Sequence, residues 1–277
     1  MKILVTGAGS GIGRVLAEQL LAAGAEVIGV DRDTAGVPAG CVARHCDLSD
    51  PAQIEALADA AGGLDGVANV AGVPGTAPPE IVLRVNYLGA RRLTEALLPR
   101  LGPGSAIVNV ASLAGRRPVV DDATAWRLQS AGDEEILTFA KGAGLDGSSA
   151  YDLSKKLLVA WTVATAADQV SRGVRACAVS PGPIDTPIID DFRTSMGASV
   201  EASAAAVGRH GTAAEVAALT AFLLSPAASW VNGIDVVADG GLLALRHVVT
   251  AAAAAANPDP DDTTPRWSPT WTPPRST

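Results

Sequence analysis

The sequence predicts an α/β protein with one doubly wound parallel sheet of about seven strands and helices on both faces. Short apolar, β-branched runs alternate with longer stretches of helical periodicity along the chain. A glycine cluster directly follows the first of these runs, and small residues or prolines follow later ones. Apolar residues make up 48% and charged residues 18% of the 277 positions, as in a globular protein with a buried sheet.

Composition argues against several classes of partner. The net charge of −8 is unfavourable for nucleic acid, which requires clustered lysine and arginine. No apolar run is long enough to span a bilayer, and residues 1–5 lead into glycines rather than into a secretory signal. The three cysteines and three histidines show no metal-ligand spacing. We therefore expect a soluble, cytoplasmic protein with reduced thiols and no metal, nucleic-acid or membrane partner.

The first strand, residues 2–6, leads into a glycine turn and then a helix that stops near Gly24. Glycines at positions 7, 11 and 13 allow a tight turn and let a pyrophosphate approach the N–H groups at the helix start. A tight turn without a ligand is the alternative. The strand and helix that flank the cluster favour dinucleotide binding.

The second strand, residues 26–30, ends at Asp31, about twenty residues beyond the glycine turn. A carboxylate there accepts hydrogen bonds from the adenosine ribose hydroxyls and repels a 2′-phosphate. This favours NAD over NADP, although Arg32 could stack on adenine or weaken that preference. A turn or capping aspartate is the alternative.

The third strand, residues 41–45, is followed by Asp47 and Leu48, and a helix begins at Pro51. The fourth strand, residues 66–70, ends in small residues that leave room for a ligand. A long helix over residues 79–101 carries Asn86 on an otherwise apolar face. Such an asparagine is either hydrogen-bonded inside the fold or part of a site.

The fifth strand, residues 106–110, places Ser112 at the sheet edge where parallel sheets bind ligands, although a turn serine is the alternative. Residues 114–149 then interrupt the pattern as an insert with one or two short helices. The following helix, from residue 150 to about 171, carries Tyr151 and Lys155 on one face. A nearby ammonium favours the phenolate and lowers its pKa, whereas a plain surface helix is the alternative.

The sixth strand, residues 174–179, precedes a segment at 187–210 that is polar and small, as in a mobile flap. A helix over 213–224 and a seventh strand over 234–238 complete a domain of residues 1–246. Residues 247–277 form an alanine- and proline-rich tail that cannot build a core, and we expect it to be disordered. Docking of Trp267 and Trp271 is the alternative for the tail.

Several motifs occur in one order along the chain: Thr6-Gly7-x-x-x-Gly11-x-Gly13, Asp31, Asp47, Asn69-x-Ala71-Gly72, Asn86, Ser112, Tyr151-x-x-x-Lys155 and Pro181-Gly182. Together they resemble the Rossmann-like short-chain dehydrogenase/reductase family over about residues 1–245. The insert, the segment from Asn86 to Ala90 and the closing segments 225–229 and 239–241 are most similar to the bacterial 3α-hydroxysteroid dehydrogenase/carbonyl reductase branch.

The resemblance implies a role for each matching residue. Tyr151 would be the general acid/base, Lys155 would lower its pKa and hold the nicotinamide ribose, and Ser112 would hydrogen-bond the substrate oxygen. Asn86 would anchor a water that links Lys155 to solvent. The implied cofactor contacts are Gly7, Ser10, Gly11, Ile12, Gly13, Asp31, Arg32, Asp47, Leu48, Asn69, Ala71, Gly72, Tyr151, Lys155, Pro181, Gly182, Ile184 and Thr186.

The implied function is an NAD(H)-dependent oxidoreductase that interconverts an apolar secondary alcohol and its ketone, steroid-like, terpenoid or aromatic. The alternative is a catalytically silent NAD-binding regulatory protein. The chain departs from the family pattern at Val70, where a second asparagine is usual, and in the 39 positions that separate Ser112 from Tyr151. The insert lies near the helices that commonly pair subunits, so the expected homo-oligomer is a tetramer or a dimer that uses another face.

Overall fold

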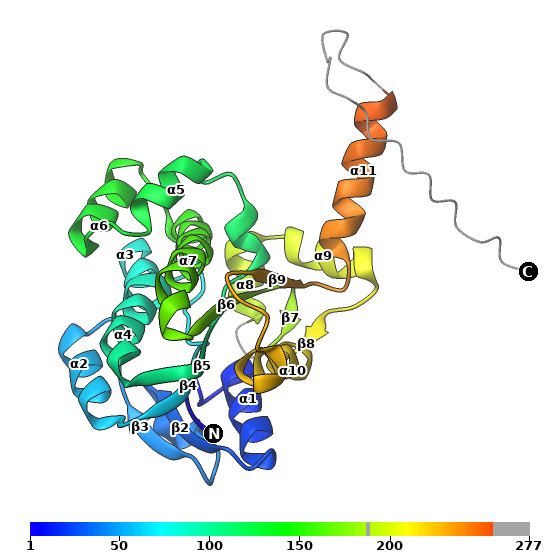
Figure 1. Ribbon diagram of the computed structural model, residues 1–277. Helices are drawn as coiled ribbons and strands as arrows, with labels where there is room; N and C mark the ends of the chain where they lie inside the picture. The colour runs from blue at the N-terminus through cyan, green and yellow to red at the C-terminus, as the bar shows by residue number, and fades with distance from the viewer. Residues whose placement is uncertain (187–188, 257–277) are drawn as a thin grey trace, which may run out of the picture. The chain divides into compact units, whose positions relative to one another are not determined.

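A computed structural model describes residues 1–186 and 189–256 of the chain (Figure 1). The chain divides into two units, Met1–Gly240 and a second that begins at Gly241. Within these described residues, the first unit holds a seven-stranded sheet in the order β3-β2-β1-β4-β5-β6-β9, and all neighbouring strands are parallel. The predicted fold class is confirmed.

The strands of this sheet are β1 (Lys2–Thr6), β2 (Glu26–Asp31), β3 (Val42–His45), β4 (Leu64–Asn69), β5 (Leu101–Val110), β6 (Arg175–Pro181) and β9 (Asp235–Ala238). Two further strands, β7 (Ile184–Asp185) and β8 (Gly211–Thr212), pair separately. The strand order reverses between β1 and β4. Open α/β sheets bind ligands at such a switch point, outside the carboxyl ends of the strands.

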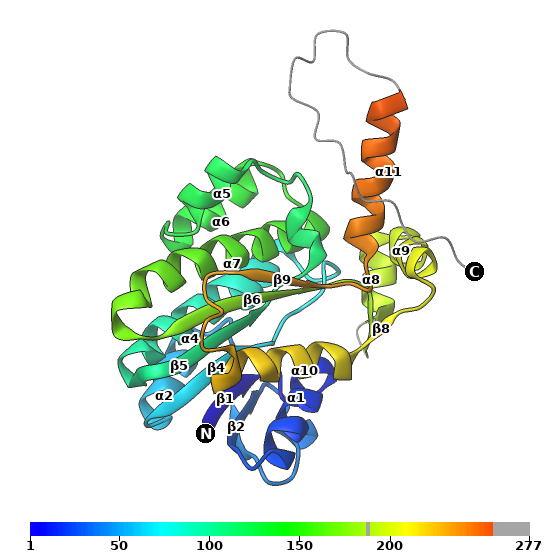
Figure 2. The same cartoon turned by 45° about the vertical axis from the view of Figure 1, so that its right-hand side comes forward.

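Helices cover both faces of the sheet. Figure 2 shows α1 (Gly11–Ala22) and α10 (Ala213–Leu224) on one face, and α2 (Pro51–Ala60), α4 (Ala90–Leu97) and α7 (Gly147–Gln169) on the other. Alternate residues of one strand reach the two layers: Val5 packs with the α1 and α10 core, and Leu4 packs with the core of α2 and α4.

The long helix expected at 79–101 consists of four successive helical pieces. These are α3 (Pro79–Leu83), a π-helical turn (Arg84–Gly89), α4 and a 3₁₀ turn (Leu98–Arg100). A Cβ on Gly89 would collide with the carbonyl oxygen of Leu48, so glycine permits this close approach to the loop after β3. The π turn contains Asn86 and aims its side chain toward the loop after β4.

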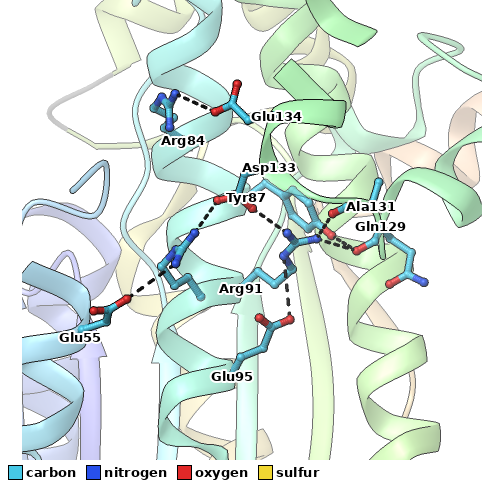
Figure 3. Close-up of polar contacts among 10 residues, drawn as sticks. Glu55, Arg84, Tyr87, Arg91, Glu95, Gln129, Ala131, Asp133 and Glu134 are labelled. Carbon is cyan, nitrogen blue, oxygen red and sulfur yellow. Dashed lines mark hydrogen bonds and ion pairs between the residues drawn. The ribbon is translucent and has the colours of Figure 1, made fainter. Parts of the chain in front are cut away.

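The insert forms two short helices, α5 (Asp122–Leu128) and α6 (Asp133–Gly142), as the sequence predicts. Arg91 of α4 fastens it: its guanidinium donates to the carbonyls of Gln129 (3.2 Å) and Ala131 (2.8 Å) and to the carboxylate of Asp133 (2.7 Å) (Figure 3). The Tyr87 hydroxyl donates to the same Gln129 carbonyl, and Arg91 lies over the Tyr87 ring. The insert is therefore bound to the helical segment that also carries Asn86.

Two segments are more regular than the sequence suggested. The flap forms α8 (Ile189–Met196) and α9 (Ser199–Val207), and in the second unit α11 (Leu242–Ala256) includes residues 247–256 of the expected disordered tail. Both α9 and α11 are rich in alanine, which has the highest helix propensity even where no apolar period is present. Residues 187–188 and 257–277, including Trp267 and Trp271, lie outside the described part of the chain.

Replacing Arg91 with methionine should lower the free energy of unfolding by about 2 kcal/mol, because the partly buried Ala131 carbonyl loses its donor and Asp133 loses one cation. The matched control is Arg92→Met. Arg92 binds the same Asp133, but its side chain is 38% exposed, and its loss should cost less than about 1 kcal/mol. Urea unfolding measures both values. Equal losses in the two variants would contradict a special role for Arg91 in holding the insert.

Candidate active site

The structure brings the predicted catalytic residues together at the carboxyl edge of the sheet. Ser112 lies two positions beyond β5, and Tyr151 lies in the second turn of α7. Their side chains are hydrogen-bonded to each other, and the Ser112 hydroxyl also accepts the Ala114 N–H at 3.1 Å. The separation of 39 positions between Ser112 and Tyr151 is therefore no obstacle, because the segment between them folds into ordered structure that includes α5 and α6.

A 3₁₀ turn (Leu113–Arg116) presses the segment after Ser112 against α7. A Cβ on Gly115 would lie 2.8 Å from the carbonyl carbon of Lys155, so a larger residue would push the two elements apart. The next residue but one, Arg117, contacts the Asp152 carboxylate at 3.3 Å. The start of α7 is itself fixed by a capping box between Asp146 and Ser149.

Lys155 is 4% exposed, and its ammonium donates to the Val110 carbonyl at 2.9 Å. It lies 5.6 Å from the centre of the Tyr151 ring. Burial lowers the pKa of Lys155 to about 8, because a low-dielectric environment disfavours the charged form. The amine therefore remains mainly protonated at pH 7.

Burial has the opposite effect on Tyr151 and raises its pKa to about 12. The hydrogen bond from Ser112 and the charge of Arg117 act in the lowering direction, and Asp152 adds to the increase. This differs from the lowered phenol pKa expected from Lys155 alone. The physical reason is that desolvation of the buried phenol outweighs the stabilising contacts of its phenolate.

The side chain of Asn86 clamps the backbone of Val73. Its amide oxygen accepts the Val73 N–H at 2.7 Å, and its amide nitrogen donates to the Val73 carbonyl at 3.0 Å and to the Ser154 hydroxyl at 3.4 Å. A Cβ on Gly72 would lie 3.3 Å from this amide oxygen and 3.7 Å from the Lys155 ammonium. Asn86 thus makes internal hydrogen bonds and also lies beside Gly72 and Lys155 of the predicted site, so the two alternatives from the sequence are compatible.

The glycine turn fits the pyrophosphate of a dinucleotide. Gly7 and Gly11 have positive φ angles of 70° and 51°, and a Cβ on Gly13 would collide with the Gly7 carbonyl oxygen. The first turn of α1 contains no acidic residue, and the Ser10 side chain does not cap it. The positive end of the helix dipole is therefore left to an external anion.

Asp31 lies beside this turn, at the end of β2. Its carboxylate accepts the N–H groups of Gly9 (2.8 Å) and Asp33 (3.0 Å), and a Cβ on Gly9 would lie 2.9 Å from it. Asp47 is held in a similar way by Ser49, whose backbone and hydroxyl hydrogen bonds lower the pKa of the Asp47 carboxyl group, with a further contribution from Arg32. Leu48 is buried next to it.

Asn69, a predicted cofactor contact, turns its side chain into the sheet. Its amide nitrogen donates to Thr94 (2.8 Å) and Asn109 (2.7 Å), and Asn109 in turn donates to Thr162 (2.8 Å). Sequence reasoning did not single out these partners, although polar residues inside apolar strands and helices were a usable signal.

The other predicted contacts line the same edge. The Thr6 hydroxyl accepts the N–H groups of Val70 (3.0 Å) and Ala71 (3.1 Å), which fixes the end of β4 beside the glycine turn. The remaining predicted residues are Ile12 in α1, Pro181 at the end of β6, Gly182 directly after it, Ile184 in β7, and Thr186 directly after β7. Gly182 donates its N–H to the Ala238 carbonyl at 3.0 Å.

Over residues 1–186 and 189–256, no helix is long and apolar enough to cross a membrane, and no group of three histidine, cysteine or acidic side chains could hold a metal ion.

Two family models match the chain: "short chain dehydrogenase" over residues 1–124 and "Enoyl-(Acyl carrier protein) reductase" over residues 135–243. Coniferyl-alcohol dehydrogenase of Pseudomonas sp. (strain HR199) is 39% identical over 245 residues, which are 87% of this chain and 96% of the relative. The 3-alpha-hydroxysteroid dehydrogenase/carbonyl reductase of Comamonas testosteroni is 34% identical over 257 residues, 88% of this chain and 96% of the relative.

Among solved structures, the 3-alpha-hydroxysteroid dehydrogenase from Pseudomonas sp. B-0831, complexed with NADH, matches with a TM-score of 0.79 and 33% identity. The match covers 90% of this chain and 99% of that one. The two family matches leave a gap only at residues 125–134 within positions 1–243, inside the insert. The resemblance read from the motifs, including its hydroxysteroid dehydrogenase branch, is confirmed, and the chain belongs to the short-chain dehydrogenase/reductase family of oxidoreductases.

Proposed function

We propose that the protein is an NAD(H)-dependent oxidoreductase that interconverts an apolar secondary alcohol and its ketone. The observation that carries the proposal is the meeting of Ser112, Tyr151 and Lys155 at one sheet edge, next to a glycine turn that fits a dinucleotide. Membership of an oxidoreductase family supports the reaction class. Relatives named for coniferyl alcohol and for hydroxysteroids support an alcohol as the substrate.

In this proposal Tyr151 takes the proton from the substrate hydroxyl during oxidation and returns it during reduction. The Ser112 hydroxyl, already hydrogen-bonded to the phenol, orients the same substrate oxygen and stabilises negative charge on it. The Lys155 ammonium donates one hydrogen bond to the Val110 carbonyl, and its other N–H groups can bind the nicotinamide ribose. The nicotinamide, when bound, supplies or accepts the hydride. Asn86 keeps the Val73 backbone in place beside these groups.

The surroundings of Tyr151 support an apolar substrate. Tyr151 belongs to a cluster of buried apolar residues that includes Ala111, with Val73 packed against it. A flap segment rich in small and apolar residues follows β7, and the Thr76 hydroxyl donates to Asp191 of α8 at 3.3 Å. A largely apolar wall suits a ring system such as a steroid, a terpenoid or an aromatic alcohol better than a sugar.

The same proposal includes a cytoplasmic homo-oligomer. The insert covers part of α4 and α7, which favours pairing through another surface. The edge strand β9 is only half-buried in the single chain, and Trp230 just before it is 99% exposed. These exposed groups make the β9 edge the candidate face for a dimer.

Turnover is tested by following NADH formation from NAD, and separately NADPH formation from NADP, over a panel of steroid, terpenoid, aromatic and aliphatic secondary alcohols. A 3α-hydroxysteroid belongs in the panel, and coniferyl alcohol, a primary alcohol, is tested beside it, because two relatives carry those names. We expect alcohol-dependent reduction of NAD with at least one apolar member. Cofactor binding without reduction by any alcohol would contradict the proposed reaction.

Tyr151→Phe should lower kcat by about 10²-fold to 10⁴-fold, because it removes the group that transfers the proton. NAD binding, measured by calorimetry, should remain within about twofold, since the phenol serves chemistry more than affinity. The matched control is Tyr87→Phe, the other tyrosine of the chain, whose hydroxyl bonds the insert rather than the site. Joint loss of turnover and NAD binding in Tyr151→Phe would refute the assignment of Tyr151.

Asp31→Ala should narrow the preference for NAD over NADP by about tenfold. The substitution removes the hydrogen bonds of the carboxylate to the ribose and its repulsion of a 2′-phosphate, which together we expect to contribute about 1.4 kcal/mol. Asp33→Ala removes a neighbouring carboxylate that only caps the following turn, at the Ala35 N–H, and serves as the control. The measurement is the ratio of kcat/KM with each cofactor. An unchanged ratio in Asp31→Ala would exclude Asp31 as the selecting residue.

A further inference from the structure

An ion pair connects the Ser112 segment, residues 112–117, to the edge strand β9. The Arg116 guanidinium contacts the Asp235 carboxylate at 2.6 Å, although 119 positions separate the two residues. The Asp235 side chain is 10% exposed, whereas that of Arg116 is 44% exposed. The pair therefore extends from the surface to a nearly buried carboxylate at one edge of the sheet.

Asp235 lies at the same level of the sheet as two buried asparagines. The strand register pairs Asn69 with Asn109, and Asn109 with Ala178. Ala178 in turn pairs with Asp235. The neighbouring Val236 packs with the α1 and α10 core, so alternation along β9 turns Asp235 to the opposite face, which α4 and α7 cover. The three polar side chains thus form one row across that face.

Each side chain of this row binds one element that lies on the face. The two asparagines donate to helices, one to Thr94 of α4 and the other to Thr162 of α7, both at 2.8 Å. Asp235 accepts from Arg116, the last residue of the 3₁₀ turn that follows Ser112. The helix α7 and the 3₁₀ turn are therefore both bound to the same level of the sheet.

The 3₁₀ turn connects Arg116 rigidly to Ser112. The Ser112 hydroxyl accepts the Ala114 N–H and the Ser112 carbonyl accepts the Gly115 N–H, each at 3.1 Å. The Ala114 carbonyl accepts the Arg117 N–H at 3.0 Å. Because these hydrogen bonds fix the backbone on both sides of Arg116, we expect a displacement of Arg116 to displace the Ser112 hydroxyl as well.

We propose that Arg116 and Asp235 are positioning residues for Ser112: their ion pair holds the 3₁₀ turn so that the Ser112 hydroxyl stays beside the Tyr151 phenol. This inference rests on the proposed function of Ser112 and Tyr151. It gives the edge strand β9 a part in the reaction, although the motifs around Ser112 and Tyr151 do not include that strand.

Stability alone is a poor explanation of the pair. Among the described residues, the Oδ1 atom of Asp235 is buried without a hydrogen-bond partner, and only Oδ2 contacts Arg116. A buried oxygen without a partner carries a desolvation penalty, and replacing a buried ion pair with apolar residues is often neutral or stabilising. Two apolar side chains would therefore stabilise the fold as well, but they would not fix the direction in which residue 116 extends.

The first test measures alcohol oxidation in Arg116→Met, in the wild type and in a Ser112→Ala background. In the wild-type background we expect kcat to fall about tenfold, because a small misplacement of a reacting group is costly, with the Kd for NAD within about twofold. In the Ser112→Ala background, Arg116→Met should change kcat by less than about twofold, since no hydroxyl is left to position. An equal loss of kcat in both backgrounds would overturn the proposal.

Three further variants define the cause of the loss. Asp235→Asn should reproduce it, and Asp235→Asn combined with Arg116→Met should lose no more than either alone. Arg116→Lys should recover most of the wild-type kcat, because the contact uses a single nitrogen. The matched control is Arg127→Met, which breaks an exposed ion pair of the same 2.6 Å length to Glu135 inside the insert and should leave kcat unchanged.

A second readout needs no substrate. Hydrogen exchange, followed by mass spectrometry on peptides that span residues 111–118, reports opening of the 3₁₀ turn. Arg116→Met should accelerate exchange of the turn amides about fivefold, whereas Arg127→Met should not. Circular dichroism confirms that the variants are folded.

The two readouts separate this inference from the proposed function. If no alcohol in the panel is oxidised but exchange is faster in Arg116→Met, the proposed function fails and the hold of Arg116 on the Ser112 turn is supported. Unchanged exchange in Arg116→Met rejects the role of the ion pair, whatever substrate the enzyme accepts.

Discussion

The close packing of the Ser112 segment on α7 is the constraint on which the candidate active site depends. Ser112 is fixed by the parallel pairing of β5 with its neighbours, whereas Tyr151 belongs to a helix that begins only after two inserted helices. The two side chains meet because Gly115 lets the backbones approach until a Cβ would lie 2.8 Å from the Lys155 carbonyl carbon. Without that approach, the hydroxyl and the phenol could not act on one oxygen atom.

The insert contributes to this packing because it is fixed near its start and again in its middle. Arg117 and Asp152 hold the side nearest Ser112, and Arg91 holds the turn between α5 and α6 (Figure 3). A flexible connection of the same length would lose conformational entropy when Ser112 and Tyr151 come together, and this loss would oppose their contact. An ordered insert avoids that loss. The π-helical turn contributes to both the candidate site and the insert, because Asn86 faces the site and Tyr87 is hydrogen-bonded to the insert.

The sequence was sufficient for the fold, because strand ends and glycine spacing are local properties, and the Tyr151–Lys155 interval is a local property on which the predicted site rests. It was insufficient wherever a distant partner decides the outcome. The Asn69 side chain is turned inward because it donates to Thr94 of α4 and Asn109 of β5, both far away in the sequence. The α9 and α11 helices follow from alanine propensity rather than from an apolar period, and periodicity alone therefore missed them.

The pKa values of Tyr151 and Lys155 show why the four-residue interval between them could not by itself predict their protonation states. One cause, burial, raises the pKa of Tyr151 to about 12 and lowers that of Lys155 to about 8, so both groups are driven toward their neutral forms. A dry site suits an apolar substrate, but it makes the phenolate costly to form.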